Sequence, residues 1–163
     1  MPAAQIMCML SSGTGILQLG DKMNEEKLLT SMLHTVQMGQ VGIRSVMKNA
    51  VDVQLKKELK AQLKEYDALE EETLSLASSR GLTLKDLNPA LETMSTLMSK
   101  VQLMGGEVDS KIAGMLIQGN TRGMILGLKN LRKAAKADPQ TCQLAQRLLN
   151  RENINIQKSQ QFL

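Results

Sequence analysis

The sequence predicts an all-α protein, an antiparallel four-helix bundle with one additional short helix. The 163 residues include one Tyr, one Phe and no Trp, so the 42% apolar share is almost entirely aliphatic residues and Met. Such a composition favours helices over sheets. Apolar residues also recur at helical spacing over long segments, and short connections with Asn, Asp, Gly or Pro separate these segments. A chain of this length folds as one domain.

Residues 1–22 differ from the rest of the chain, because they carry no charge before Asp21 and show no sustained apolar period. We expect a disordered or loosely attached leader, followed by the bundle domain over 23–163. Gly20-Asp21-Lys22 stands directly before Met23, and a purine-rich stretch resembling a bacterial ribosome-binding site can encode it. A further hypothesis is therefore that translation starts at Met23 and that the leader is an untranslated extension.

The first two helices are predicted from about Asn24 to Asn49 and from about Asp52 to Ser79. Asn24 is a suitable N-cap, and Gly81 suits the position after the end of the second helix. Gly39 lies on the inward face of the first helix, where it lets a neighbouring helix come close. The inward faces comprise Leu28, Leu29, Met32, Leu33, Val36, Ile43, Val46 and Met47, then Leu55, Leu59, Leu63, Tyr66, Leu69, Thr73 and Ala77.

Three more helices follow. Pro89–Met104 forms the short one, with Pro at its first position and Gly105-Gly106 after its end. The next runs from about Asp109 to Lys136 and contains four glycines, so a break at Gly119-Asn120 is an alternative. Asp138-Pro139 caps the last helix, which reaches about Gln160. Its apolar residues are Leu144, Leu148, Leu149, Ile154 and Ile156.

Basic residues gather toward the C-terminus, where Arg132, Lys133 and Lys136 form the densest group. One interpretation is an anion-binding patch. The other is that these cations complement the dipole at a helix C-terminus. The net charge of +4 is too small to imply a nucleic-acid partner.

The cysteines, the N-terminus and the lengths of the apolar stretches all favour a cytoplasmic protein. Cys8 and Cys142 match no metal or redox spacing, which favours a reducing compartment. The N-terminus lacks the pattern of a signal peptide, and no stretch reaches about 18 uninterrupted apolar residues. We expect a cytoplasmic protein without a membrane partner.

Metal sites in long-helix bundles use inward-facing Glu and Glu-x-x-His pairs. The chain has a single His, His34, and Ser31 stands three residues before it. On a helical wheel His34 lies opposite the apolar face, so we expect it to face solvent or a subunit contact. No nucleophile has a His partner, and no phosphate-binding Gly loop is present. The sequence therefore predicts no enzyme and no cofactor.

Two carboxylates occupy the spacing that a metal site would need. Glu70-x-x-Thr73 lies on the inward face of the second helix, and Glu152-x-x-Asn155 lies on the last helix. Glu70 is a candidate metal ligand, a hydrogen-bonded core group or a boundary residue. Glu152 is the second candidate ligand.

Residues 23–163 resemble a bacterial family of small ferritin-like four-helix proteins, mostly of unassigned function. The resemblance rests on Val-Gly-Ile-Arg at 41–44, on Arg80-Gly81 after the second helix, and on the spacing of Asp109, Ile112 and Gly119-Asn120.

Ferritin-like relatives hold a di-iron or di-manganese pair, and the resemblance implies where its ligands would stand in this chain. Asn120 stands where a Glu is expected, and Thr73 and Asn155 stand where His is expected. Glu70 and Glu152 remain as remnants. The resemblance thus implies a ferritin-like bundle that has lost its metal centre.

Three functions remain open. The first is a non-catalytic structural or interaction module, homo-oligomeric and preferably dimeric, through the Gly-rich helix 109–136 or a Met38/Val41 face. The second is residual metal binding by Glu70 and Glu152 in a stress-related protein. The third is weak anion or nucleic-acid binding through the basic C-terminal third, which includes Arg147 and Arg151.

Overall fold

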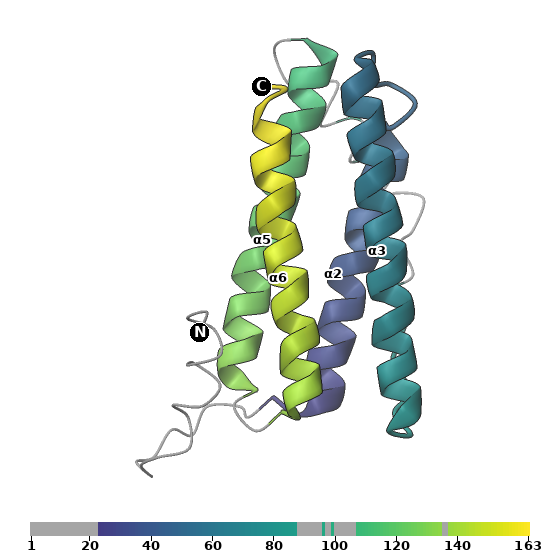
Figure 1. Cartoon of the computed structure of the whole chain (residues 1–163), viewed down its shortest axis with the longest axis vertical. Coiled ribbons are helices and arrows are strands. Elements are labelled where there is room, and N and C mark those ends of the chain that lie inside the picture. The colour runs from purple at the N-terminus through teal and green to yellow at the C-terminus, as the bar shows by residue number, and fades with distance from the viewer. Residues whose placement is uncertain (1–22, 88–95, 97–98, 100–106, 135–136) are drawn as a thin grey trace.

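The computed structural model describes residues 23–87, 96, 99, 107–134 and 137–163. These residues form four long helices and no strand (Figure 1), which confirms the predicted all-α four-helix fold. The leader 1–22 lies outside the described residues, as does most of the short helix expected at Pro89–Met104, where only Thr96 and Ser99 are described. The helices are α2 (Glu25–Val46), α3 (Val53–Ser79), α5 (Val108–Lys133) and α6 (Pro139–Gln160).

The helices begin where the sequence predicts them to begin. The side chain of Asn24 accepts a hydrogen bond from the backbone amide of Lys27 at 2.9 Å. Asp52 and Asp138 cap α3 and α6 in the same way. Such caps satisfy backbone amides that the first turn of a helix leaves without a partner. Gly81 has a φ of +68°, as expected for the residue that follows a helix end. The alternative break at Gly119-Asn120 is wrong, because α5 is continuous.

The bundle is a ring in which each helix packs against antiparallel neighbours (Figure 1). α2 packs against α3 and α5, and α6 packs against α5 and α3. At one end, the Asp109 carboxylate accepts hydrogen bonds from the amides of Val51 and Asp52, both at 2.8 Å. At the other end, Arg80 pairs with Glu25 and with Asp138.

A long crossover joins α3 to α5. Arg80 and Asp109 lie at opposite ends of the bundle, so α3 ends at one end of it and α5 begins at the other. The first part of the crossover follows α2, since His34 contacts the Lys85 carbonyl and Gln37 accepts a hydrogen bond from the Leu87 amide at 2.7 Å. The consequence is that α3 and α5 run in the same direction (Figure 1).

Three ion pairs join α3 to α6. The three glutamates on α3 are spaced seven residues apart, which places them on one face of the helix. The pairs are Glu58 with Lys158 at 3.0 Å, Glu65 with Arg151 at 2.8 Å, and Glu72 with Arg147 at 2.6 Å.

The predicted core is correct for α2 and α3 and wrong in part for α6. Ile154 is 37% exposed and Ile156 is half-buried, whereas Glu152, Asn155 and Ser159 are buried in their place. The Met38/Val41 face considered as an oligomer contact is only partly exposed, because Met38 is 39% exposed and Val41 is buried. Among the described residues, no helix combines the length and hydropathy needed to cross a membrane.

Candidate functional site

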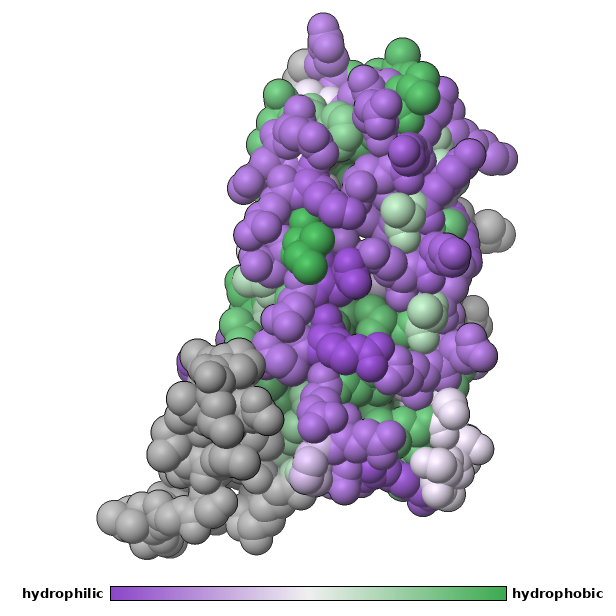
Figure 2. All heavy atoms as spheres, viewed as in Figure 1, coloured by the Kyte–Doolittle hydropathy of each residue, from purple (hydrophilic) through white to green (hydrophobic). Residues whose placement is uncertain are grey.

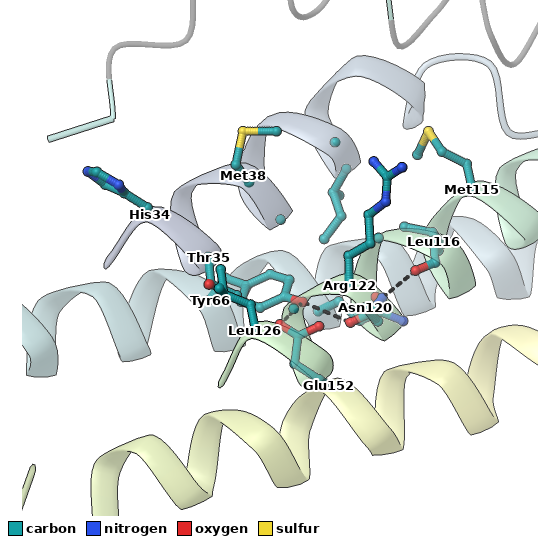
Figure 3. A pocket seen from close by; sticks show the side chains of 16 residues that line it. His34, Thr35, Met38, Tyr66, Met115, Leu116, Asn120, Arg122, Leu126 and Glu152 are labelled. Carbon is teal, nitrogen blue, oxygen red and sulfur yellow. Dashed lines mark hydrogen bonds between the residues drawn. The ribbon is translucent and has the colours of Figure 1, made fainter. Parts of the chain in front are cut away.

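A cleft of about 320 Å³ opens between α2 and α5 (Figure 3). Gly42 on α2 and Gly119 on α5 both line it, and a Cβ atom added at either position would meet nothing within 4 Å. These two glycines therefore leave room between the helices. The aliphatic and Met side chains of the walls are Met38, Ile43, Met115, Leu116 and Leu126.

The floor of the cleft is a buried polar cluster from three helices, centred on the hydroxyl of Tyr66 (Figure 3). This oxygen lies 2.9 Å from Asn120 Oδ1 and 3.0 Å from Glu152 Oε1. Asn155 Nδ2 approaches it from α6 at 3.4 Å. Asn120 is fixed in turn, because its Nδ2 donates to the Leu116 carbonyl at 2.7 Å. The four side chains lie near the middle of the bundle and are almost fully buried.

The protonation state of Glu152 follows from its burial. Only 2% of the residue is exposed, and the loss of solvent raises the pKa of its carboxyl to about 8, although the hydrogen bond with Tyr66 acts in the opposite direction. Burial and the neighbouring Glu152 raise the pKa of Tyr66 well above 10.0. Both groups are therefore mainly neutral at pH 7.

A neutral Glu152 also gives the Tyr66 hydroxyl a donor on one side and leaves the hydroxyl's own proton free for Asn120. The Tyr66 hydroxyl has one proton and cannot donate to two acceptors. With Glu152 protonated, its carboxyl donates to the Tyr66 oxygen, and Tyr66 donates to Asn120 Oδ1.

Gln62 adds an acceptor without a partner to this floor. Its side chain lines the cleft and is 0% exposed, and its Oε1 has no hydrogen-bond partner among the described residues. Nearby on α6, Asn155 Oδ1 and Ser159 Oγ are buried and likewise unpartnered. Buried polar atoms without partners are uncommon, and each costs about 1–3 kcal/mol. Two amide oxygens and one hydroxyl on the facing parts of α3 and α6 are therefore buried without a hydrogen-bond partner among the described residues.

Two glycines give the floor its shape. A Cβ at Gly39 would lie 2.6 Å from Tyr66 Cε2, so the ring occupies space that any other residue on α2 would fill. A Cβ at Gly123 would lie 3.0 Å from Glu152 Oε2. The expected close approach at Gly39 is thus confirmed, with Tyr66 as the group that approaches.

The two carboxylates predicted as metal ligands are not brought together. Glu152 lies in the floor, whereas Glu70 accepts hydrogen bonds from Gln37 at 2.8 Å and Gln40 at 2.7 Å at the contact of α2 with α3. The two share no hydrogen-bond partner. The described residues contain no group of three or more His, Cys, Asp or Glu side chains placed to hold a metal ion. Glu70 is half-buried and hydrogen-bonded, so it combines features of two alternatives that the sequence left open, the hydrogen-bonded group and the boundary residue.

His34 is half-buried at the edge of the cleft, where its Nε2 lies 2.8 Å from the Lys85 carbonyl oxygen. A carbonyl only accepts, so this contact requires a proton on Nε2. His34 therefore contributes to holding the first part of the crossover against α2.

The basic residues of the C-terminal third do not form one patch in the described part of the chain. Arg132 and Lys133 are exposed in the last turn of α5, and Lys136 lies outside the described residues. Arg147 and Arg151 are paired with glutamates of α3.

Gln62 was not among the residues predicted from the sequence, and Tyr66 was predicted only as a core residue. A usable signal was present, since the single Tyr of an aromatic-poor chain stands on an inward face and a buried hydroxyl needs a partner.

No family model matches the sequence, and no curated protein matches it. Among solved structures, the chain is similar to a conserved hypothetical protein, Rv2844, from Mycobacterium tuberculosis. The identity is 11%, the match covers 85% of this chain and 96% of that one, and the TM-score is 0.67. This likeness concerns the fold alone.

Proposed function

We propose that this protein is a non-catalytic ferritin-like bundle of the bacterial cytoplasm that acts as an interaction module and forms a homodimer. Its long crossover between α3 and α5 supports the ferritin-like assignment, because ferritin-like bundles have one such connection. Two of the positions at which the resemblance implies metal ligands carry Asn120 and Asn155, and both amides contact the Tyr66 hydroxyl beside the single carboxylate of Glu152. A core of this kind favours a binding or structural role over redox chemistry.

The observation that carries the proposal is an apolar stripe on the outward face of α5. Ile125 is 48% exposed and Leu128 is 39% exposed, and Met124, one turn before Leu128, is half-buried on the same side of the helix. The face formed by α3 and α6 is mostly hydrophilic in Figure 2, so the stripe is not part of a generally apolar surface. Contiguous exposed apolar surface is typical of protein contacts.

Light scattering of the full chain at tens of micromolar tests the proposal. We expect the mass of a dimer for the natural sequence and of a monomer for the double variant I125E/L128E, because carboxylates at a buried contact lose their hydration. Leu74 on α3 has the same 39% exposure as Leu128, so L74E is the matched control and should remain a dimer. A monomeric natural protein at this concentration contradicts the proposal, and so does equal dissociation by L74E.

A further inference from the structure

We propose that the cleft between α2 and α5 binds a small neutral amphiphile, with a hydrogen-bond-donating head on the buried polar floor and an aliphatic body along the apolar walls. This inference concerns a different surface from the outward stripe of α5 and does not depend on the dimer.

The head is defined by the unpartnered acceptor on the floor. Gln62 Oε1 is completely buried, lines the cleft and has no partner among the described residues. Glu152 also lines the cleft, and a Cβ added at Gly123 would lie 3.0 Å from its Oε2. A hydroxyl or amide head that donates to Gln62 would satisfy this oxygen in a site sheltered from water, where an unpaired acceptor is expensive.

The body is defined by the walls and the volume. Met38, Met115 and Leu126 are aliphatic or thioether side chains around the opening (Figure 3), and Met side chains adapt to varied ligand shapes. The cleft of about 320 Å³ is at the small end of ligand sites. At roughly 30 Å³ per heavy atom, the volume that a water occupies, it holds a molecule of about ten heavy atoms.

The charges around the cleft favour a neutral head. The floor presents oxygen acceptors from Gln62 and Asn120 beside the buried Glu152, and such a floor disfavours an anionic head. The guanidinium of Arg122 extends from α5 beside the same cleft and disfavours a cationic one (Figure 3).

Three probes that share a six-carbon chain and differ in their head group test the proposal. The full-length protein, labelled at its methionine methyl groups, is titrated with 1-hexanol, hexanoate and hexylammonium and followed by NMR. Because Met38 and Met115 both line the cleft, we expect their methyl signals to shift saturably with hexanol. The two charged probes should bind at least tenfold more weakly.

Two variants separate the cleft from non-specific binding. A Cβ at Gly119 meets nothing within 4 Å, and Leu has a higher helix propensity than Gly, so we expect Gly119→Leu to fold, to fill part of the cleft and to lose hexanol binding. Gln118→Leu, the exposed neighbour outside the cleft, is the matched control and should bind normally. Gln62→Leu removes the acceptor at similar volume and should weaken hexanol binding roughly fivefold, as for one net hydrogen bond.

Each remaining outcome overturns the proposal. The absence of saturable shifts at Met38 and Met115 shows that the cleft takes no such ligand. Tighter binding of hexanoate indicates an anion held by Arg122, and tighter binding of hexylammonium indicates a cation site on the floor. Unchanged hexanol binding in Gln62→Leu shows that the buried Gln62 oxygen does not bind the head group.

Discussion

Replacing Glu152 by Gln should remove a loss of stability that the buried carboxyl causes as the pH rises from 5 to 8. The carboxyl is 2% exposed and its pKa in the folded protein is about 8, against an ordinary value of 4.5. Between these two values the folded state holds a proton that the unfolded chain has released, so the free energy of unfolding falls with increasing pH. At about 1.4 kcal/mol per pH unit, the loss amounts to roughly 3–4 kcal/mol between pH 5 and pH 8.

The Gln side chain keeps the shape of a protonated Glu and does not titrate, and its amide can still donate to the Tyr66 oxygen. The free energy of unfolding of both proteins is measured by urea denaturation at intervals from pH 5 to pH 9 and extrapolated linearly. We expect the difference between variant and natural protein to grow steadily until about pH 8 and then to level off. Other titrating groups cancel in this difference, because both proteins carry them.

Parallel stability curves for the two proteins would refute the reasoning, since they would show that Glu152 has the same pKa in the folded and unfolded states. A difference that grows toward low pH would refute the sign of the argument. A direct NMR titration of the Glu152 carboxyl carbon provides an independent check, with a midpoint expected well above the ordinary value for Glu.

Three further predictions concern the packing of the bundle. Gly39→Ala places a Cβ 2.6 Å from the Tyr66 ring and should lower the free energy of unfolding by about 1–3 kcal/mol in urea denaturation. Gly42→Ala is the control: its Cβ meets open space, so it should raise the free energy of unfolding by about 0.5–1 kcal/mol. If both variants lose stability, the close contact of Gly39 with Tyr66 is not the cause. Tyr66→Phe leaves the buried Asn120 Oδ1 without its donor and should cost about 1–3 kcal/mol; thermal unfolding that matches the natural protein would count against the hydrogen bond. Asp109→Ala removes the carboxylate that binds two backbone amides ahead of α3, and should cost about 1 kcal/mol with faster hydrogen exchange at those amides; unchanged exchange there would exclude this capping role.

The helices of this protein could be predicted because their signals are local. Asn24 and the Asp138-Pro139 step mark helix starts through hydrogen bonds to amides two or three residues away. Gly81 follows a helix end because it adopts a positive φ without strain. The inward faces of α2 and α3 were also correct, because aliphatic residues there recur with the period of the helix.

The buried face of α6 could not be predicted in the same way. Its C-terminal half contains two Ile residues among a majority of polar ones, and apolar periodicity alone assigns the Ile residues to the core. The structure buries Glu152, Asn155 and Ser159 instead. A polar side chain is acceptable in a core when another helix supplies a partner, and the Tyr66 hydroxyl on α3 is such a partner for two of them.

The sequence alone therefore determined the helical class, the starts of the described helices and the aliphatic core of α2 and α3, since each depends on residues within a few positions of one another. The tertiary structure alone decided which carboxylate is buried: it placed Glu152 beside Tyr66 and left Glu70 with two glutamines at the boundary. The physical reason is that burial of a polar group depends on partners from distant parts of the chain, and Tyr66 and Glu152 are 86 residues apart.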